Sequence, residues 1–176
     1  MLSDKNSFET DRLILKPIVM TDIDHLSPIY QNLNVMKYIY DGSIFSKEEA
    51  ESRVRGFAKH WQNHGFGMWL FQMKSDNSVI GYGGFRYFED ERPVFKQQIE
   101  LGYILNEPYW SMGFASEAVN QAVQLGLNQY GINRILATIL PDNISSQKVV
   151  IKAGLEHTFD ADFDGLLHQV YEINKP

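Results

Sequence analysis

Residues 99–117, IELGYILNEPYWSMGFASE, constrain the fold of this chain more than any other segment. Apolar residues alternate with other residues over 99–105, and this period of two predicts a strand. Pro108 ends the pattern, because proline donates no backbone hydrogen bond. The small-residue turn at 110–115 leads into apolar positions with a helical period, and Gly131 is a natural end for that helix. The segment therefore predicts a strand, a tight turn and a helix.

Such a turn would point several free backbone N–H groups at one spot, at the positive end of a helix dipole. This arrangement binds anions and suits a pyrophosphate. Gly113 would let the backbone approach a ligand closely, and Ala115 keeps a second approach point small. An ordinary strand-to-helix connection is the alternative. The turn is neither a Walker P-loop, since no Lys-Ser or Lys-Thr follows the glycine, nor a dinucleotide fingerprint, since the three-glycine spacing is missing.

The segment resembles the central motif of the Gcn5-related N-acetyltransferases (GNAT), and most closely the branch of the ribosomal-protein N-terminal acetyltransferases. The matching positions are Gly102, Tyr103, Pro108, Tyr109, Trp110, Gly113, Ala115, Glu117 and Ala118. Trp110 departs from the usual Gln or Arg, and Ser111 stands where many members of the branch carry Gly. Both positions contribute through backbone N–H groups in the family. The resemblance extends over about residues 10–173 and begins with a Thr-x-Arg-Leu-x-Leu-x-Pro opening at Thr10.

The resemblance implies that the strand and the turn bind acetyl-coenzyme A, the turn through its pyrophosphate. The implied cofactor-binding residues here are Leu101, Gly102, Tyr103, Ile104, Trp110, Ser111, Met112, Gly113, Phe114 and Ala115. A second motif, Asn-x-x-Ser followed by Lys-x-Gly, starts at Asn143. From the residues alone, Asn143 is a helix N-cap. By resemblance, Asn143 would bind the pantetheine arm and Ser146 would lie near the sulfur.

Two residues are catalytic candidates. Glu100 lies in an otherwise apolar strand, where a charge needs a partner, water or a raised pKa. It would act as a general base through one water, or it is a partly solvated residue or a structural partner of Arg86. Ser146 would protonate the leaving thiolate, with Tyr103 and Tyr109 as alternatives. Strand N–H groups would polarise the thioester oxygen, and positioning would supply most of the rate.

Composition restricts the partners. The chain has 176 residues, 44% of them apolar, a net charge of −6 and no cysteine. We expect one domain over 1–176, a cytoplasmic location, and neither nucleic acid nor membrane as a partner. Five scattered histidines lack ligand spacing, so no metal is expected.

Periodicity and caps predict the other elements. Strands are expected at 12–18, 67–73, 79–88, 134–140, 155–159 and 167–173, with a connection at 160–165 between the last two. Helices are expected after Thr21, with an apolar side that continues to Leu33, after the capping box at Ser46, and after Asn143. The order predicts a mixed α/β fold with a mostly antiparallel central sheet flanked by helices, and the resemblance identifies it as the acyl-CoA N-acyltransferase (GNAT) fold.

The resulting hypothesis is an enzyme that moves an acetyl group from acetyl-coenzyme A to a primary amine by direct attack in a ternary complex. The acceptor is a protein N-terminus or a small amine, such as a polyamine, an amino acid or an antibiotic. A non-catalytic coenzyme A-binding module is the alternative, and the chain would be a monomer or a homodimer.

Overall fold

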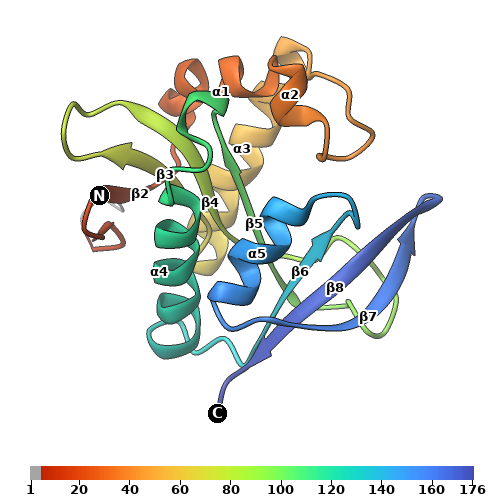
Figure 1. The fold of residues 1–176 in the computed structure, drawn as a ribbon. Helices are drawn as coiled ribbons and strands as arrows, with labels where there is room; N and C mark the ends of the chain where they lie inside the picture. The colour runs from red at the N-terminus through yellow and green to blue at the C-terminus, as the bar shows by residue number, and fades with distance from the viewer. Residues whose placement is uncertain (1–4) are drawn as a thin grey trace.

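The strand expected at 99–105 lies inside an open eight-stranded sheet in the computed structural model, which describes residues 5–176 (Figure 1). The spatial order is β1-β2-β3-β4-β5-β6-β8-β7, and only β5 and β6 are parallel neighbours. The strands are β1 (Phe8–Glu9), β2 (Leu13–Pro17), β3 (Met68–Met73), β4 (Val79–Tyr87), β5 (Ile99–Leu105), β6 (Arg134–Ile139), β7 (Glu156–Phe163) and β8 (Leu166–Asn174). The predicted mixed, mostly antiparallel sheet is confirmed.

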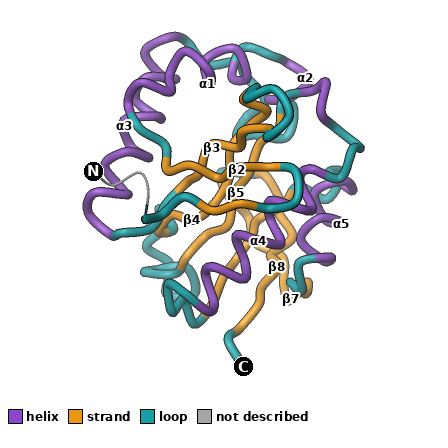
Figure 2. Tube along the Cα trace, turned by 90° about the vertical axis from the view of Figure 1, so that its left-hand side faces the viewer, coloured by secondary structure: helices purple, strands orange, loops and turns teal. Residues whose placement is uncertain are grey.

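Helices cover both faces of the sheet (Figures 1 and 2). They are α1 (Ile23–Tyr30), α2 (Leu33–Met36), α3 (Lys47–His64), α4 (Phe114–Asn128) and α5 (Ile144–Lys152), with 3-10 turns η1 (Met20–Asp22) and η2 (Glu107–Tyr109). Leu101 of β5 belongs to the buried cluster that includes Val119 of α4, whereas Ile104 belongs to the cluster that includes Val54 of α3. The period of two thus divides β5 between two cores. No helix within residues 5–176 has the length and apolar character needed to cross a membrane.

Local signals explain several elements. The Ser46 hydroxyl accepts a hydrogen bond from the Glu49 N–H over 3.2 Å, and the Glu49 carboxylate accepts one from the Ser46 N–H over 2.7 Å. This capping box starts α3 as predicted. An added Cβ at Gly81 would lie 2.2 Å from the Ile104 carbonyl oxygen. The close contact between β4 and β5 therefore requires glycine.

The first helix differs from the prediction. Thr21 is not an N-cap, because the Asp22 carboxylate accepts a hydrogen bond from the Val19 N–H over 2.8 Å and closes a 3-10 turn before α1. Leu33 does not continue the apolar side of α1. It lies in the separate helix α2 with 66% of its surface exposed, after Asn32 has capped a new turn. Short polar side chains thus redirect the chain here.

The last hairpin is longer than expected. β7 continues through the region expected to be a loop and ends at Phe163. Asp164 and Gly165 then form a two-residue turn with positive φ values of 53° and 85°. This geometry is that of a tight hairpin turn, for which Asp-Gly is a favoured sequence. The alternation of Phe159, Ala161 and Phe163 was the signal for the longer strand.

Candidate active site

A cavity of about 740 Å³ lies where β5 and β6 part. The two strands pair only at Ile99 with Ile135 and at Glu100 with Leu136. Beyond these pairs the cavity lies against both strands and the start of α5. Its wall on this side, the α5 wall, consists of Glu100, Leu101, Gly102, Tyr103, Ile104, Ala137, Thr138, Ile139, Leu140, Asn143, Ser146 and Val150. The structure therefore brings the predicted strand residues together with Asn143 and Ser146.

The backbone of β5 offers hydrogen-bonding groups to this cavity. The Asn106 N–H donates to a carbonyl of β4 over 2.8 Å and extends the ladder between these strands. Bonded and non-bonded pairs alternate along antiparallel strands, so the even-numbered residues of β5 bond to β4. The N–H and C=O groups of Leu101 and Tyr103 therefore face the side of β6. Gly102 and Ile104 use their backbone groups in bonds to β4. Of the predicted cofactor-binding residues in this strand, only Leu101 and Tyr103 therefore direct backbone groups at the cavity.

Tyr103 and Ser146 form a hydroxyl pair in the α5 wall. The Tyr103 hydroxyl lies 2.7 Å from Ser146 Oγ, and either group can donate in this hydrogen bond. Burial raises the pKa of Tyr103 to about 12, although the hydrogen bond with Ser146 opposes the shift. The phenol therefore keeps its proton at neutral pH. Tyr109 lies in η2 against Phe114 and does not line the cavity.

Asn143 holds the start of α5 in place. Its side-chain oxygen accepts a hydrogen bond from the Ser146 N–H over 3.2 Å, which confirms the predicted N-cap. Asn143 also lines the cavity. The cap thus sets the position of the Ser146 hydroxyl, which links a structural role of Asn143 to the site.

The turn at 110–115 follows β5 but does not line the cavity. Its backbone is unusual, because Ser111 and Gly113 both have positive φ values, 59° and 83°. Within residues 5–176, no protein group accepts a hydrogen bond from the backbone N–H groups of 111–116. Trp110 ties the turn to the strand by donating from Nε1 to the Leu105 carbonyl over 2.8 Å. The predicted cluster of free N–H groups at the start of α4 is therefore present.

Arg12 supports this turn from outside, a role that our sequence analysis missed. It donates to the Glu117 carboxylate over 2.7 Å and to the Met112 carbonyl over 2.9 Å, and its guanidinium lies 4.1 Å from the centre of the Phe114 ring. Burial alone would raise the pKa of Glu117, but the hydrogen bonds from Thr10 and Arg12 outweigh it and hold that pKa below its usual value. The signal was the Thr-x-Arg opening, which we had matched to the family without assigning it a role.

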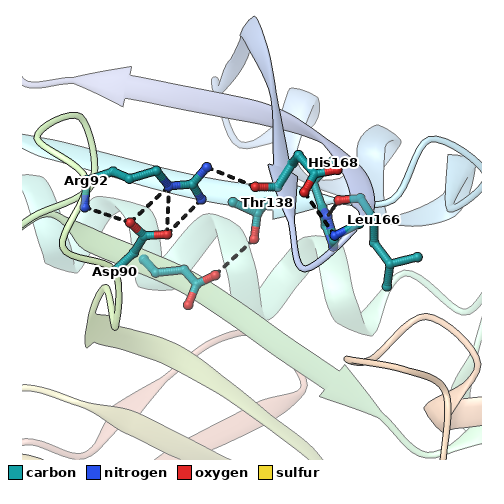
Figure 3. A network of polar contacts seen from close by, with 8 residues as sticks. Asp90, Arg92, Thr138, Leu166 and His168 are labelled. Carbon is teal, nitrogen blue, oxygen red and sulfur yellow. Dashed lines mark hydrogen bonds and ion pairs between the residues drawn. The ribbon is translucent and has the colours of Figure 1, made fainter.

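Glu100 is paired inside the cavity. Both Nε and an NH2 nitrogen of Arg86 lie 2.7 Å from Glu100 Oε2. Glu100 Oε1 accepts a hydrogen bond from the Thr138 hydroxyl over 3.0 Å, which is the dashed line at Thr138 in Figure 3. Only 8% of Glu100 is exposed. The ion pair foreseen as an alternative is therefore present, and Oε1 keeps room for a further donor.

A second part of the cavity wall, the α3 wall, comes from separate parts of the chain. The loop after α2, α3 itself, and the β7–β8 hairpin contribute Tyr40, Phe45, Arg53, Phe57, Phe163 and His168. Arg92 holds the hairpin by donating to the Asp162 carbonyl over 2.8 Å and by stacking 4.5 Å from the centre of the Phe163 ring, while it pairs with Asp90 (Figure 3). This wall is aromatic, and the same segments add the carboxylates of Asp41, Glu49 and Asp164 in addition to Arg53.

Comparison with known proteins decides the family. The family model described as "Acetyltransferase (GNAT) domain" matches residues 12–156. The chain belongs to the GNAT acetyltransferases. This family assignment confirms the resemblance and identifies the protein as an acetyl-coenzyme A-dependent acyltransferase.

Relatives of this GNAT chain agree. The uncharacterized N-acetyltransferase YoaA of Bacillus subtilis is 29% identical over 96% of this chain and 90% of its own length. A solved structure from Bordetella pertussis, assigned to the GNAT family, superposes with a TM-score of 0.83 at 21% identity, covering 95% of this chain and 98% of that one. The structure of RimL, a ribosomal-protein α-N-acetyltransferase solved with coenzyme A, superposes with a TM-score of 0.80 at 18% identity. The match covers 96% of this chain and 98% of that one. The predicted GNAT fold is confirmed, and a structure of the ribosomal-protein branch shares it.

No group of three or more His, Asp or Glu residues in the described chain is arranged to hold a metal ion.

Proposed function

We propose that this GNAT enzyme transfers the acetyl group of acetyl-coenzyme A to a primary amine by direct attack in a ternary complex. The observation that carries the proposal is the parting of β5 from β6. It frees backbone groups of Leu101 and Tyr103 beside the Tyr103–Ser146 hydroxyl pair. The acceptor is either a protein N-terminus or a small amine.

In this proposal the cofactor occupies the α5 wall. The unpaired N–H groups at the start of α4 would bind the pyrophosphate, with Trp110, Ser111, Met112, Gly113, Phe114 and Ala115 forming the turn. The β5 backbone and Asn143 would hold the pantetheine arm. The acceptor would then enter from the α3 wall, where loops and side chains rather than strand edges line the cavity.

The chemistry requires three proton and charge movements. The amine nitrogen attacks the thioester carbonyl, and backbone N–H groups stabilise the oxygen that becomes negative. Glu100 Oε1 would accept the proton lost by the amine, directly or through water, while Arg86 fixes the carboxylate. Collapse breaks the carbon–sulfur bond, and Ser146, supported by Tyr103, would give a proton to the thiolate.

Binding and turnover test the proposal separately. Acetyl-coenzyme A should raise the thermal midpoint, because it binds the folded site only, and free acetate should not. A set of primary amines that includes peptides with free N-termini should release thiol when acetylated. A midpoint that saturating acetyl-coenzyme A leaves unmoved would refute the proposal. A shift without transfer to any amine would identify a coenzyme A-binding module instead.

The hydroxyl pair has its own test within this experiment. Ser146→Ala removes the group nearest the thiolate, and Tyr103→Phe removes only its supporting hydroxyl. Both variants should keep the acetyl-coenzyme A shift, and Ser146→Ala should lose more turnover. Equal turnover of Ser146→Ala and the parent would exclude Ser146 as the acid.

A further inference from the structure

Arg53 is an unpaired cation in the α3 wall. It lies in the middle of α3 and lines the cavity. Within residues 5–176, no carboxylate lies within 4.0 Å of its guanidinium, and none of its N–H groups donates to a protein acceptor. Arg86, in the same cavity, is instead held by Glu100. One of the two cavity arginines is therefore satisfied within the protein, and the other is available to a ligand.

Aromatic rings hold the Arg53 guanidinium. It lies 4.7 Å from the centre of the Tyr40 ring and 5.8 Å from that of Phe57. These contacts use no N–H donor in a hydrogen bond to a protein acceptor within residues 5–176, so the donors of the guanidinium stay available to a ligand. The guanidinium matches a planar oxyanion, which it can bind through two parallel hydrogen bonds.

The turn that carries Tyr40 is strained in a way that serves this arrangement. Tyr40 has a φ of 52°, which is uncommon for a residue with a large side chain. The Asp41 carboxylate stabilises the turn by accepting hydrogen bonds from the backbone N–H and the hydroxyl of Ser43, over 3.0 and 2.6 Å. Tyr40 also stacks on Phe45 at 5.9 Å. The loop thus fixes an exposed tyrosine against Arg53 at the cavity.

The charges around the cavity favour a ligand with both signs. Its charged residues, apart from His168, are Asp41, Glu49, Glu89, Glu100, Asp164, Arg53 and Arg86. The excess of carboxylates suits the ammonium group of an acceptor and disfavours a second negative charge on it. A single carboxylate at Arg53 is the anion that these surroundings accept best.

We propose that Arg53 binds a carboxylate of the acceptor, so that the acceptor is a free amino acid rather than a protein N-terminus or a polyamine. The inference rests on the proposed function and specifies its substrate class. The ammonium group lies toward Glu100 and the carboxylate lies at Arg53. A polyamine would bring only positive charge to Arg53, and the first residue of a protein carries an amide where an amino acid carries its carboxylate.

Amino acids paired with their amides test this assignment. Phenylalanine and phenylalaninamide form the first pair, because the wall is aromatic, and other α-amino acids with their amides complete the panel. We expect at least one amino acid to be acetylated with a KM at least tenfold below that of its amide. Arg53→Gln should raise the KM of that acid roughly 10- to 100-fold, the usual effect of losing a charged hydrogen bond, and leave the KM of the amide unchanged.

Two variants control the experiment. Arg55→Gln removes the same charge from an exposed position of α3 outside the cavity and should change neither KM. Arg53→Lys keeps the charge without the planar fork and should give an intermediate KM. Three results would each overturn the assignment. The first is acetylation of amides with the same KM as the acids, and the second is an Arg53→Gln change in KM that acids and amides share. The third is acetylation of peptides where no amino acid reacts. In all three cases the acetylation of an amine would leave the proposed function standing. That function itself would be refuted by the absence of both an acetyl-coenzyme A shift and acetylation of any amine.

Discussion

The two walls of the cavity are built in opposite ways. The α5 wall and the turn at 110–115 present backbone groups and small hydroxyls from two continuous segments of chain, 99–116 and 137–150. The α3 wall presents side chains from at least three separate segments: the loop around Tyr40, α3, and the β7–β8 hairpin. Backbone groups keep their positions when side chains change, whereas a side-chain wall changes with every substitution. One wall can therefore serve a constant cofactor while the other adapts to an acceptor.

Arg12 and Arg53, which do not pair with Glu100, show a similar difference between a supporting and an available side chain. Arg12 donates to Glu117 and to Met112 and thereby supports the turn. Arg53 has aromatic neighbours, and no carboxylate of the described residues 5–176 pairs with it. A supporting residue needs its partners inside the protein, and a recognition residue needs one left open.

Gly113→Val, in the turn at 110–115, should give the largest effect. A side chain at this φ of 83° would strain the turn, and the strained turn would no longer direct its N–H groups at the pyrophosphate of the proposed cofactor. The thermal shift with acetyl-coenzyme A should vanish. Gly131→Val is the matched control. Gly131 also has a positive φ, 65°, and open space around it, and it follows the other end of α4 from the turn. If Gly113→Val bound the cofactor normally, the turn would not be the anion site.

Glu100→Gln, in the cavity, should give the second largest effect. Turnover should fall by roughly 10²–10⁴, the range for losing general base catalysis, while the acetyl-coenzyme A shift persists. The variant also leaves Arg86 without its anionic partner, so its thermal midpoint should drop, and rates must be measured well below it.

Thr138→Val separates these effects, because it removes only the hydrogen bond to Oε1 and keeps the ion pair. Near-parent turnover of Glu100→Gln at neutral pH, with an identified acceptor, would assign Glu100 to the ion pair alone. Positioning would then be the main source of the rate.

Asn143 allows a finer test of the α5 wall, because its capping role and its proposed contact with the cofactor can be separated. Asn143→Ala should cost about 1 kcal/mol of stability through the lost cap and should also weaken cofactor binding. Asn143→Asp keeps a capping oxygen but loses the amide N–H groups. Thermal midpoints with and without coenzyme A measure both changes. Parent-like binding by Asn143→Asp would show that the residue acts only as a cap.

The smallest effect should come from His60, at the end of α3 away from the cavity. Its Nδ1 lies 2.9 Å from the Phe66 carbonyl oxygen, and its Nε2 accepts a hydrogen bond from the Tyr87 N–H over 3.2 Å. Burial lowers the pKa of His60 below its usual 6.5, despite the bond to Phe66. The unfolded chain therefore takes up this proton more readily, and stability should decline as the pH falls below 6.5.

Thermal midpoints between pH 5 and pH 8 measure this decline. His60→Gln should flatten it without altering the acetyl-coenzyme A shift at pH 8, because His60 does not line the cavity. An unchanged decline in this variant would place the responsible group elsewhere.

The sequence by itself determined the separate local elements of the α5 wall and of the turn at 110–115. The alternation over 99–105, the turn around Gly113 and the cap at Asn143 are local, since each depends on neighbours within a few residues. Short-range rules therefore predicted the strand, the turn, the helix and the cap. The family resemblance, rather than these rules, pointed to Tyr103 and Ser146, and only folding brought their hydroxyls together across 43 residues. The same rules failed at Thr21 and in the last hairpin, where a competing side chain or a missed alternation decided the outcome.

Only the tertiary structure decided the rest. Whether Glu100 was a free base or an ion pair depended on Arg86, which lies 14 residues away and reaches it only through the register of β4 with β5. The support of the turn by Arg12 spans 105 residues. Arg53 became a candidate site because folding brought the Tyr40 ring to it, while no carboxylate of residues 5–176 lies within ion-pair distance. Periodicity reports which face a side chain occupies, but the partner across that face is set by packing between distant segments.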